Sequence, residues 1–209
     1  MELVKQTVEE FVKITASDAP APGGGSISAL AGALAAALGQ MVANLTVGRK
    51  KYAAVDEEMR QLLPELARQQ QALLEAVDED SRAFDQYMDA LSMPKDTPEQ
   101  QEARKNAMQA GLKAAAQVPL GVAQRVQTLF PALELVVTKG NANAVTDGMV
   151  ATMMARTAIL GAVYNVRVNL QSIQDETFTA ALAQQCQRCQ QEALAWERKI
   201  LATVPFSNF

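Results

Sequence analysis

The amino-acid sequence predicts an all-α protein, a single-domain helical bundle with long central helices. Ala, Leu, Gln and Glu, all strong helix formers, dominate the chain. Val and Ile occur at helical spacings and not in the alternating runs that are typical of strands. The chain also lacks internal repeats and low-complexity linkers. A length of 209 residues suits one full-sized domain, so we expect residues 1–209 to form a single unit.

Two helices are predicted in the first quarter of the chain. The first ends near Ser17–Pro20 and carries an apolar stripe of Leu3, Val4, Val8, Phe11, Val12 and Thr15. Ser26 is expected to cap the second, which is rich in alanine. Small residues recur on the second helix at three- and four-residue steps, namely Ala29, Gly32, Ala33, Ala36, Gly39 and Ala43. This face lets another backbone approach closely, which predicts a central helix or a subunit-interface helix.

A long polar helix is predicted from about Asp56 to Leu91, with a kink expected at Pro64. The loop MPKDTPEQ ends it. Thr97 is expected to cap the next helix, because Pro98 and Gln100 stand at the first-turn and capping-box positions.

This next helix is expected to bend or break at Pro119 and Pro131 and to end at Lys139–Asn141. Two further helices, roughly 145–171 and 175–203, complete the predicted fold.

The composition excludes several classes of function. The chain has no His, which removes the commonest general base, the Ser-His and Cys-His pairs and histidine metal sites. Cys186 and Cys189 form a lone C-x-x-C without a second pair, so we expect packing or solvent-facing thiols and no metal site. The net charge is −4, and Lys and Arg are spread thinly apart from Arg49–Lys51, so nucleic acid is not expected as a partner.

The sequence favours a cytoplasmic protein that is not inserted in a membrane. The N-terminal stretch MELVKQTVEEFVKI mixes charges into an amphipathic pattern, unlike a secretory signal. Residues 27–47 are long enough to cross a membrane, but they contain Gln40 and Asn44 and run directly into Gly48–Lys51. A buried helix of a soluble protein is the favoured interpretation.

The glycine turn before the alanine-rich helix is a candidate binding element. Gly23, Gly24 and Gly25 allow backbone conformations that other residues avoid, and they expose N–H groups beside a helix N-terminus, where carboxylate or phosphate can bind. A simple helix cap is the commoner role of such a turn. The motif also lacks the Lys and the spacing of a nucleotide-binding P-loop.

Ordered motifs along nearly the whole chain resemble the cyclodeaminase/cyclohydrolase family of tetrahydrofolate enzymes. The matching motifs are PGGGS at 22–26, MVANLTVGRKKY at 41–52, DEDSRAFDQYM at 78–88, MPK at 93–95, Arg104, VPL at 118–120, GNANAVTD at 140–147 and NVRVNL at 165–170. The resemblance implies an all-helical subunit, a homodimer, a tetrahydrofolate substrate that carries a one-carbon unit, and no metal or redox cofactor. Residues after Leu170, including Cys186 and Cys189, inherit no role from it.

The resemblance leaves two reactions open, with formiminotetrahydrofolate cyclodeamination slightly favoured over methenyltetrahydrofolate cyclohydrolysis. A non-catalytic helical scaffold or regulatory subunit is the alternative of another class. Both reactions need a positioned carboxyl group, which burial can bring toward the working pH. The resemblance places that group at Asp80, three residues before the pair Ala83–Phe84. Without the resemblance, Asp80 reads as part of a solvated acidic face.

Further residues are candidates for contact with the folate. Asn165 and Asn169 share a helical face and can read the polar edges of a pterin. Asp147 either contacts substrate or stabilises a helix N-terminus. It stands eighteen residues before Asn165, about 27 Å along a straight helix. The two side chains therefore serve different ends of a ligand or different subunits, unless one is structural.

Positive charge for the anionic glutamate tail of a polyglutamylated folate is expected from Arg49 and Lys50. The alternative is that these cations only stabilise the C-terminal end of the alanine-rich helix. Asn141 lies in a break that either positions a ligand or caps a helix.

Overall fold

The computed structural model describes residues 2–205, and within that range it contains helices and no β-strand. The helices are α1 (Val8–Thr15), α2 (Gly24–Thr46), α3 (Asp56–Ser92), α4 (Pro98–Gln127), α5 (Phe130–Lys139), α6 (Val145–Leu170) and α7 (Glu176–Leu201), with short 3-10 turns at Leu3–Lys5, Lys50–Val55 and Ala142–Ala144. The predicted all-α bundle is confirmed.

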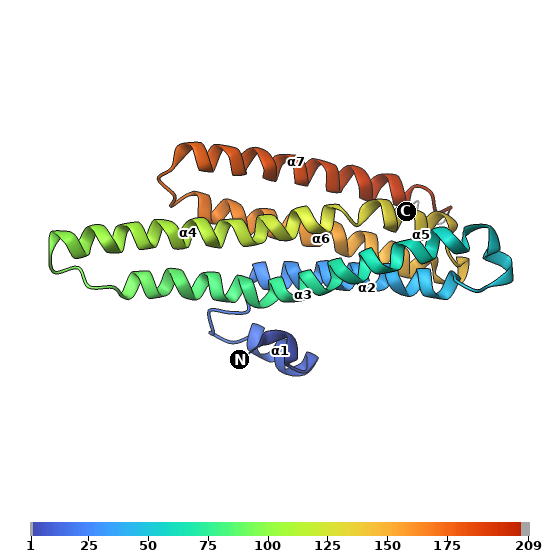
Figure 1. The fold of residues 1–209 in the computed structure, drawn as a ribbon, viewed down its shortest axis with the longest axis horizontal. Helices are drawn as coiled ribbons and strands as arrows, with labels where there is room; N and C mark the ends of the chain where they lie inside the picture. The colour runs from blue at the N-terminus through green and yellow to red at the C-terminus, as the bar shows by residue number, and fades with distance from the viewer. Residues whose placement is uncertain (1, 206–209) are drawn as a thin grey trace.

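Helices α2, α3, α4 and α6 form the centre of the bundle, around the larger of two apolar clusters; the smaller cluster lies near the C-terminus of α2 and contains Val42, Ala43, Met59, Val136 and Ala144. Helix α2 packs against α3 and α6, and α4 packs against the same two helices from the other side. Helix α7 lies along α6, and α3 and α4 form a long hairpin that continues past the first residue of α2 (Figure 1). The α3–α4 hairpin therefore extends beyond the N-terminus of α2 at this end of the bundle (Figure 1).

The small-residue face of α2 makes the closest contacts inside the bundle. A Cβ atom added at Gly32 would lie 2.5 Å from Val126 Cγ2 of α4. A Cβ at Gly39 would lie 3.1 Å from Leu133 of α5. The prediction of a central helix is therefore confirmed. The same face is occupied by helices of its own subunit, so it is not open to a second subunit, and the small residues do not themselves indicate a dimer.

The N-terminal stripe is divided where a single helix was expected. Leu3–Lys5 forms a 3-10 turn, and α1 starts after Thr7, whose hydroxyl and the Glu10 carboxylate form a capping box. The turn is held by Asp78 of α3, whose carboxylate accepts a 2.6 Å hydrogen bond from the backbone N–H of Leu3. This anchor explains why the helix does not continue upstream.

The prolines act differently from one another. Pro64 and Pro119 lie inside α3 and α4, which run through them, so the expected break at Pro119 does not occur. The chain breaks instead at Thr128–Leu129, and Pro131 lies in the first turn of α5, where its missing N–H costs nothing. The capping box at Thr97 and Gln100 forms as predicted.

Two segments, α2 and Ala142–Leu170, have the length and hydropathy of a membrane span. In α2 61% of the most apolar window is buried inside the bundle. This burial is what a core helix requires, and composition alone does not separate the two cases. Cys186 and Cys189 are free thiols buried in the core beside α4 and α6, which fits their expected packing role.

Candidate functional site

The N-terminus of α2 is built around Ser26. Gly23 is the N-cap residue, and Ser26 lies in the first turn of the helix, so the prediction that Ser26 caps α2 is wrong. Its buried hydroxyl instead donates toward α3, with Asp80 Oδ2 and the carbonyl oxygen of Val77 each 3.0 Å away. Ser26 therefore fixes the position of the Asp80 carboxyl group relative to the start of α2.

The glycines are required because side chains of two other helices occupy the space beside them. A Cβ atom at Gly25 would lie 2.0 Å from Asp80 Oδ1. A Cβ at Gly24 would lie 2.9 Å from Asn165 Nδ2 of α6. Any larger residue here would displace the carboxyl or the amide group. Asp80 and Asn165 thus flank the first turn of α2, whose leading N–H groups have no partner within the helix.

Burial changes the acid–base properties of Asp80. Desolvation raises the pKa of this carboxyl above its ordinary value, although the hydrogen bonds from Ser26 act in the opposite direction. No Lys or Arg in residues 2–205 forms an ion pair with it. A half-buried carboxyl group with a raised pKa and no cationic partner is suited to both giving and taking a proton.

Asn165 and Asn169 lie near the start of α2, and their side-chain amides donate hydrogen bonds to backbone carbonyls. The Asn165 amide donates to the Gly161 carbonyl at 2.9 Å. The Asn169 amide donates to the carbonyls of Asn165 and Ala115, at 2.9 and 3.1 Å. These bonds orient both side chains through their N–H groups and leave the side-chain oxygens to accept hydrogen bonds from a ligand. Asn169 also ties α6 to α4.

Together, the structure brings Gly23, Gly24, Gly25, Ser26, Asp80, Asn165 and Asn169 to one end of α2, which we call the glycine end. The remaining candidates, Arg49, Lys50, Asn141 and Asp147, lie near the C-terminus of α2, which we call the Asn141 end. Gly24 and Thr46 are 22 residue steps apart in α2, about 33 Å.

Hydrogen bonds between side chains and backbone groups connect the segments of the Asn141 end. The Asn141 amide donates to the Leu45 carbonyl at 3.0 Å, and its oxygen accepts from the Asn143 N–H at 3.1 Å. The Asn141 backbone N–H donates to Thr46 Oγ1 at 2.8 Å. Asn141 thus connects the C-terminus of α2 to the start of α6. It caps the 3-10 turn Ala142–Ala144 at its N-terminus, whereas the C-cap of α5 is Gly140.

The other residues of the Asn141 end are not brought to Asp80 within one subunit. Arg49 and Lys50 are exposed at the turn after α2. Asp147 lies in the first turn of α6, where a carboxylate stabilises the helix dipole, and Asn165 lies near the other end of the same helix. The expected distance of about 27 Å between Asp147 and Asn165 therefore holds, because α6 is continuous.

Sequence reasoning missed the role of Asp78 and the apolar residues that follow Asp80. Asp78 anchors the N-terminal turn, and its burial in a DED run has no signal in the sequence. Phe84 and Met88, one and two helical turns after Asp80, are exposed in spite of their size. Their four-residue spacing is typical of a stripe that faces the core, so the sequence does not indicate that they are exposed.

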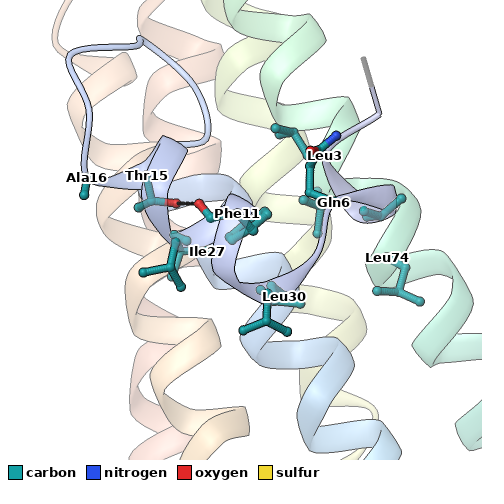
Figure 2. Close-up of a pocket in the computed structure, with 12 residues that line it drawn as sticks. Leu3, Gln6, Phe11, Thr15, Ala16, Ile27, Leu30 and Leu74 are labelled. Atoms are coloured by element: carbon teal, nitrogen blue, oxygen red, sulfur yellow. Dashed lines mark hydrogen bonds between the residues drawn. The ribbon is translucent and has the colours of Figure 1, made fainter.

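An apolar pocket of about 510 Å³ lies close to the glycine end, between α1 and the pair α2–α3. Figure 2 shows Phe11, Ile27, Leu30 and Leu74 around it. Its lining contains no titratable side chain, so it offers contact area but no acid–base chemistry. Among the described residues, no cluster of three or more His, Cys, Asp and Glu side chains has the arrangement of a metal site.

Comparison with known proteins agrees with this arrangement. The family model described as formiminotransferase-cyclodeaminase matches residues 7–188. A formimidoyltransferase-cyclodeaminase of Gallus gallus is 39% identical over 200 residues, which are 96% of this chain and 37% of that protein. The chain thus spans a little over a third of that relative.

Two stand-alone proteins are similar over their full length. A methenyltetrahydrofolate cyclohydrolase of Methylorubrum extorquens is 36% identical over 199 residues, covering 95% of this chain and 96% of that protein. The crystal structure of a formiminotetrahydrofolate cyclodeaminase from Thermotoga maritima superposes with a TM-score of 0.86 at 28% identity, covering 97% of each chain.

Proposed function

We propose, because the chain belongs to the formiminotransferase-cyclodeaminase family, that it is an enzyme that closes the one-carbon ring of 5-formiminotetrahydrofolate and releases ammonia. The observation that carries the proposal is the Asp80 carboxyl group, held by Ser26 at the glycine end with its pKa raised by burial. A non-catalytic helical scaffold requires only its apolar faces, and so it would not require a half-buried carboxyl group whose position depends on Gly25.

The reaction needs one group that accepts and then donates a proton. N10 of the folate attacks the formimino carbon on N5, which gives a carbon bonded to N5, N10 and an amino group. In our proposal the Asp80 carboxylate takes the N10 proton and the resulting carboxylic acid protonates the amino group. The bond from carbon to that amino group then breaks, ammonia leaves, and a nitrogen lone pair completes the methenyl bridge.

The other residues of the glycine end bind and orient in this scheme. The first-turn N–H groups of α2 and the side-chain oxygens of Asn165 and Asn169 offer donors and acceptors for the edge of the pterin. Gly23 to Gly25 allow the ring to approach the backbone. The reaction changes no oxidation state, so we propose that it uses neither a metal nor a redox cofactor.

Cyclohydrolysis is the second candidate, and the 36% identity to a methenyltetrahydrofolate cyclohydrolase supports it. There, water adds to the methenyl carbon, N5 is released and the formyl group stays on N10. Asp80 would take a proton from water and give one to N5. The two reactions share a tetrahedral centre and hence one carboxyl group.

Supplying the purified protein with 5-formiminotetrahydrofolate and, separately, with 5,10-methenyltetrahydrofolate tests the proposal. We expect ammonia release from the first compound. Loss of methenyl absorbance from the second compound without ammonia release from the first would establish the cyclohydrolase instead. Inactivity on both would leave the scaffold or regulatory subunit.

We also propose that the protein is a cytoplasmic homodimer that takes polyglutamylated folate and is not inserted in a membrane. Exposed apolar side chains at seven-residue spacing, Ile27, Leu34 and Met41, form an outer stripe on α2 that suits a helix of a second subunit. Light scattering should give a mass of twice 22.5 kDa, and Leu34→Glu should shift the measured mass toward that of the monomer.

A further inference from the structure

A basic pocket lies at the tip of the α3–α4 hairpin, away from the residues assigned above. It has a volume of about 460 Å³ and is lined by Lys95, Arg104 and Lys105 together with Gln101, Met108, Gln109 and Gln174. The lining thus carries three positive charges and no carboxylate. No ion pair is formed by these three cations within residues 2–205. Two of the motifs noted in the sequence, MPK and Arg104, meet here.

The walls of this pocket are fixed by hydrogen bonds. The Arg104 guanidinium donates through Nε and Nη2 to the Leu91 carbonyl, at 3.2 and 3.0 Å. Its remaining N–H groups are left for a ligand. Gln109 joins α4 to the turn after α6, donating to the Ser172 carbonyl at 3.0 Å and accepting from the Gln174 N–H at 2.8 Å. Lys95 and Lys105 are exposed at the rim.

The packing of α2 against α3 shows that the pocket lies beyond Asp80 along the axis of α3. Gly25 contacts Asp80 and Gly32 contacts Leu73, so α2 and α3 are antiparallel and α3 continues past the start of α2. Arg104 is level with Leu91, eleven residues after Asp80, which is about 16 Å along α3.

The same face of α4 that touches α2 also carries the pocket. Met108 and Val126 are eighteen residues apart, which is five helical turns. Val126 lies against Gly32 of α2, so Met108 points in the same direction beyond the start of α2. Exposed Phe84 and Met88 lie on α3 between Asp80 and the pocket.

We propose that this pocket binds the carboxylates of the glutamate tail of the folate, while the aminobenzoyl ring packs on Phe84 and Met88. The inference rests on the proposed function and names the residues that hold the glutamate tail of its substrate. The order of groups in the substrate, pterin, aromatic ring and carboxylates, matches the order of Asp80, apolar surface and cations along α3. Arg49 and Lys50, about a full length of α2 away, are not needed for the tail.

Binding of reduced folates with one and with three glutamates, measured by calorimetry, tests the pocket. We expect the wild-type protein to prefer the triglutamate, and the preference to fall as salt is added. Lys95→Ala/Lys105→Ala should reduce the ratio of the two affinities roughly three- to tenfold, as expected for partly exposed ion pairs. Lys95→Arg/Lys105→Arg keeps the charges and should retain the preference.

Arg49→Ala/Lys50→Ala is the matched control, because it removes two positive charges from the Asn141 end. It should leave the ratio unchanged. An unchanged ratio in the Lys95/Lys105 alanine variant, or a ratio lost only in the Arg49/Lys50 variant, would overturn the inference and leave the proposed function intact. Absence of any folate binding by the wild-type protein would overturn both.

Discussion

The two ends of α2 contain similar polar residues but differ in what these residues hold. At the Asn141 end, the side chain of Asn141 bonds to the backbone on both sides of it, which joins α2 to the start of α6. At the glycine end, Asp80 is held by one serine, is partly buried and has no cationic partner. Polar groups that complete a turn stabilise the fold. A restrained carboxyl group that can still form hydrogen bonds to a ligand can transfer protons.

Replacement of Asp80 should have the largest effect. Asp80→Asn keeps the size of the side chain and can still accept from Ser26, but it removes the titrating group. Turnover should fall by roughly 100-fold or more, with a smaller change in KM. Glu79→Gln, at the exposed neighbouring position, is the control. Near-normal turnover in the Asp80 variant would end the assignment.

Gly25→Ala should have the next largest effect. The added Cβ would lie 2.0 Å from Asp80 Oδ1, so the carboxyl group must move. Turnover should fall by roughly tenfold, since small displacements of a catalytic group are costly. Gly121→Ala adds a methyl group in open space on α4 and should leave turnover unchanged. Equal rates for the two variants would show that Asp80 is not confined as described.

At the other end, Asn141→Ala should affect stability and not binding. It removes the bonds to the Leu45 carbonyl and the Asn143 N–H, which should lower the free energy of unfolding by about 1–2 kcal/mol. Chemical denaturation measures this, with the exposed Asn44→Ala as control. A large loss of folate affinity without a loss of stability would assign this end to the binding site.

The smallest effect concerns pH. Since burial raises the pKa of Asp80, the folded protein binds its proton more tightly than the unfolded chain does. The free energy of unfolding therefore falls as pH rises from the ordinary pKa of an aspartate through the raised one. In the Asp80→Asn variant, this decrease in the free energy of unfolding is absent. The melting temperature of the variant relative to wild type should rise across that range, and a constant difference would contradict the raised pKa.

Much of the fold was predictable from local patterns. The capping box at Thr97, the small-residue face of α2 and the long α3 each depend on short-range spacing, and each formed as expected. The role of Ser26 was not predictable in this way. Its hydroxyl has a better partner in Asp80, 54 residues away, than in the cap of its own helix.

The candidate site was predictable only in part. Family motifs identified Asp80, the glycines and Asn165, which the fold brings together. They also identified Arg49 and Asn141, which the fold places at the far end of α2. A sequence motif indicates that a residue is a candidate for function or structure, but it does not give the position of that residue in the fold. The separation follows from the continuous 23-residue helix that links the two groups.

Hydrogen–deuterium exchange with and without a stable reduced folate tests most directly whether the glycine end binds the substrate. We expect slower exchange at residues 23–27, at residues 80–91 of α3 and at residues 95–109 around the basic pocket, because ligand binding suppresses local opening. Residues 139–147 should exchange at an unchanged rate. Protection confined to residues 139–147, with none at residues 23–27, would contradict the account.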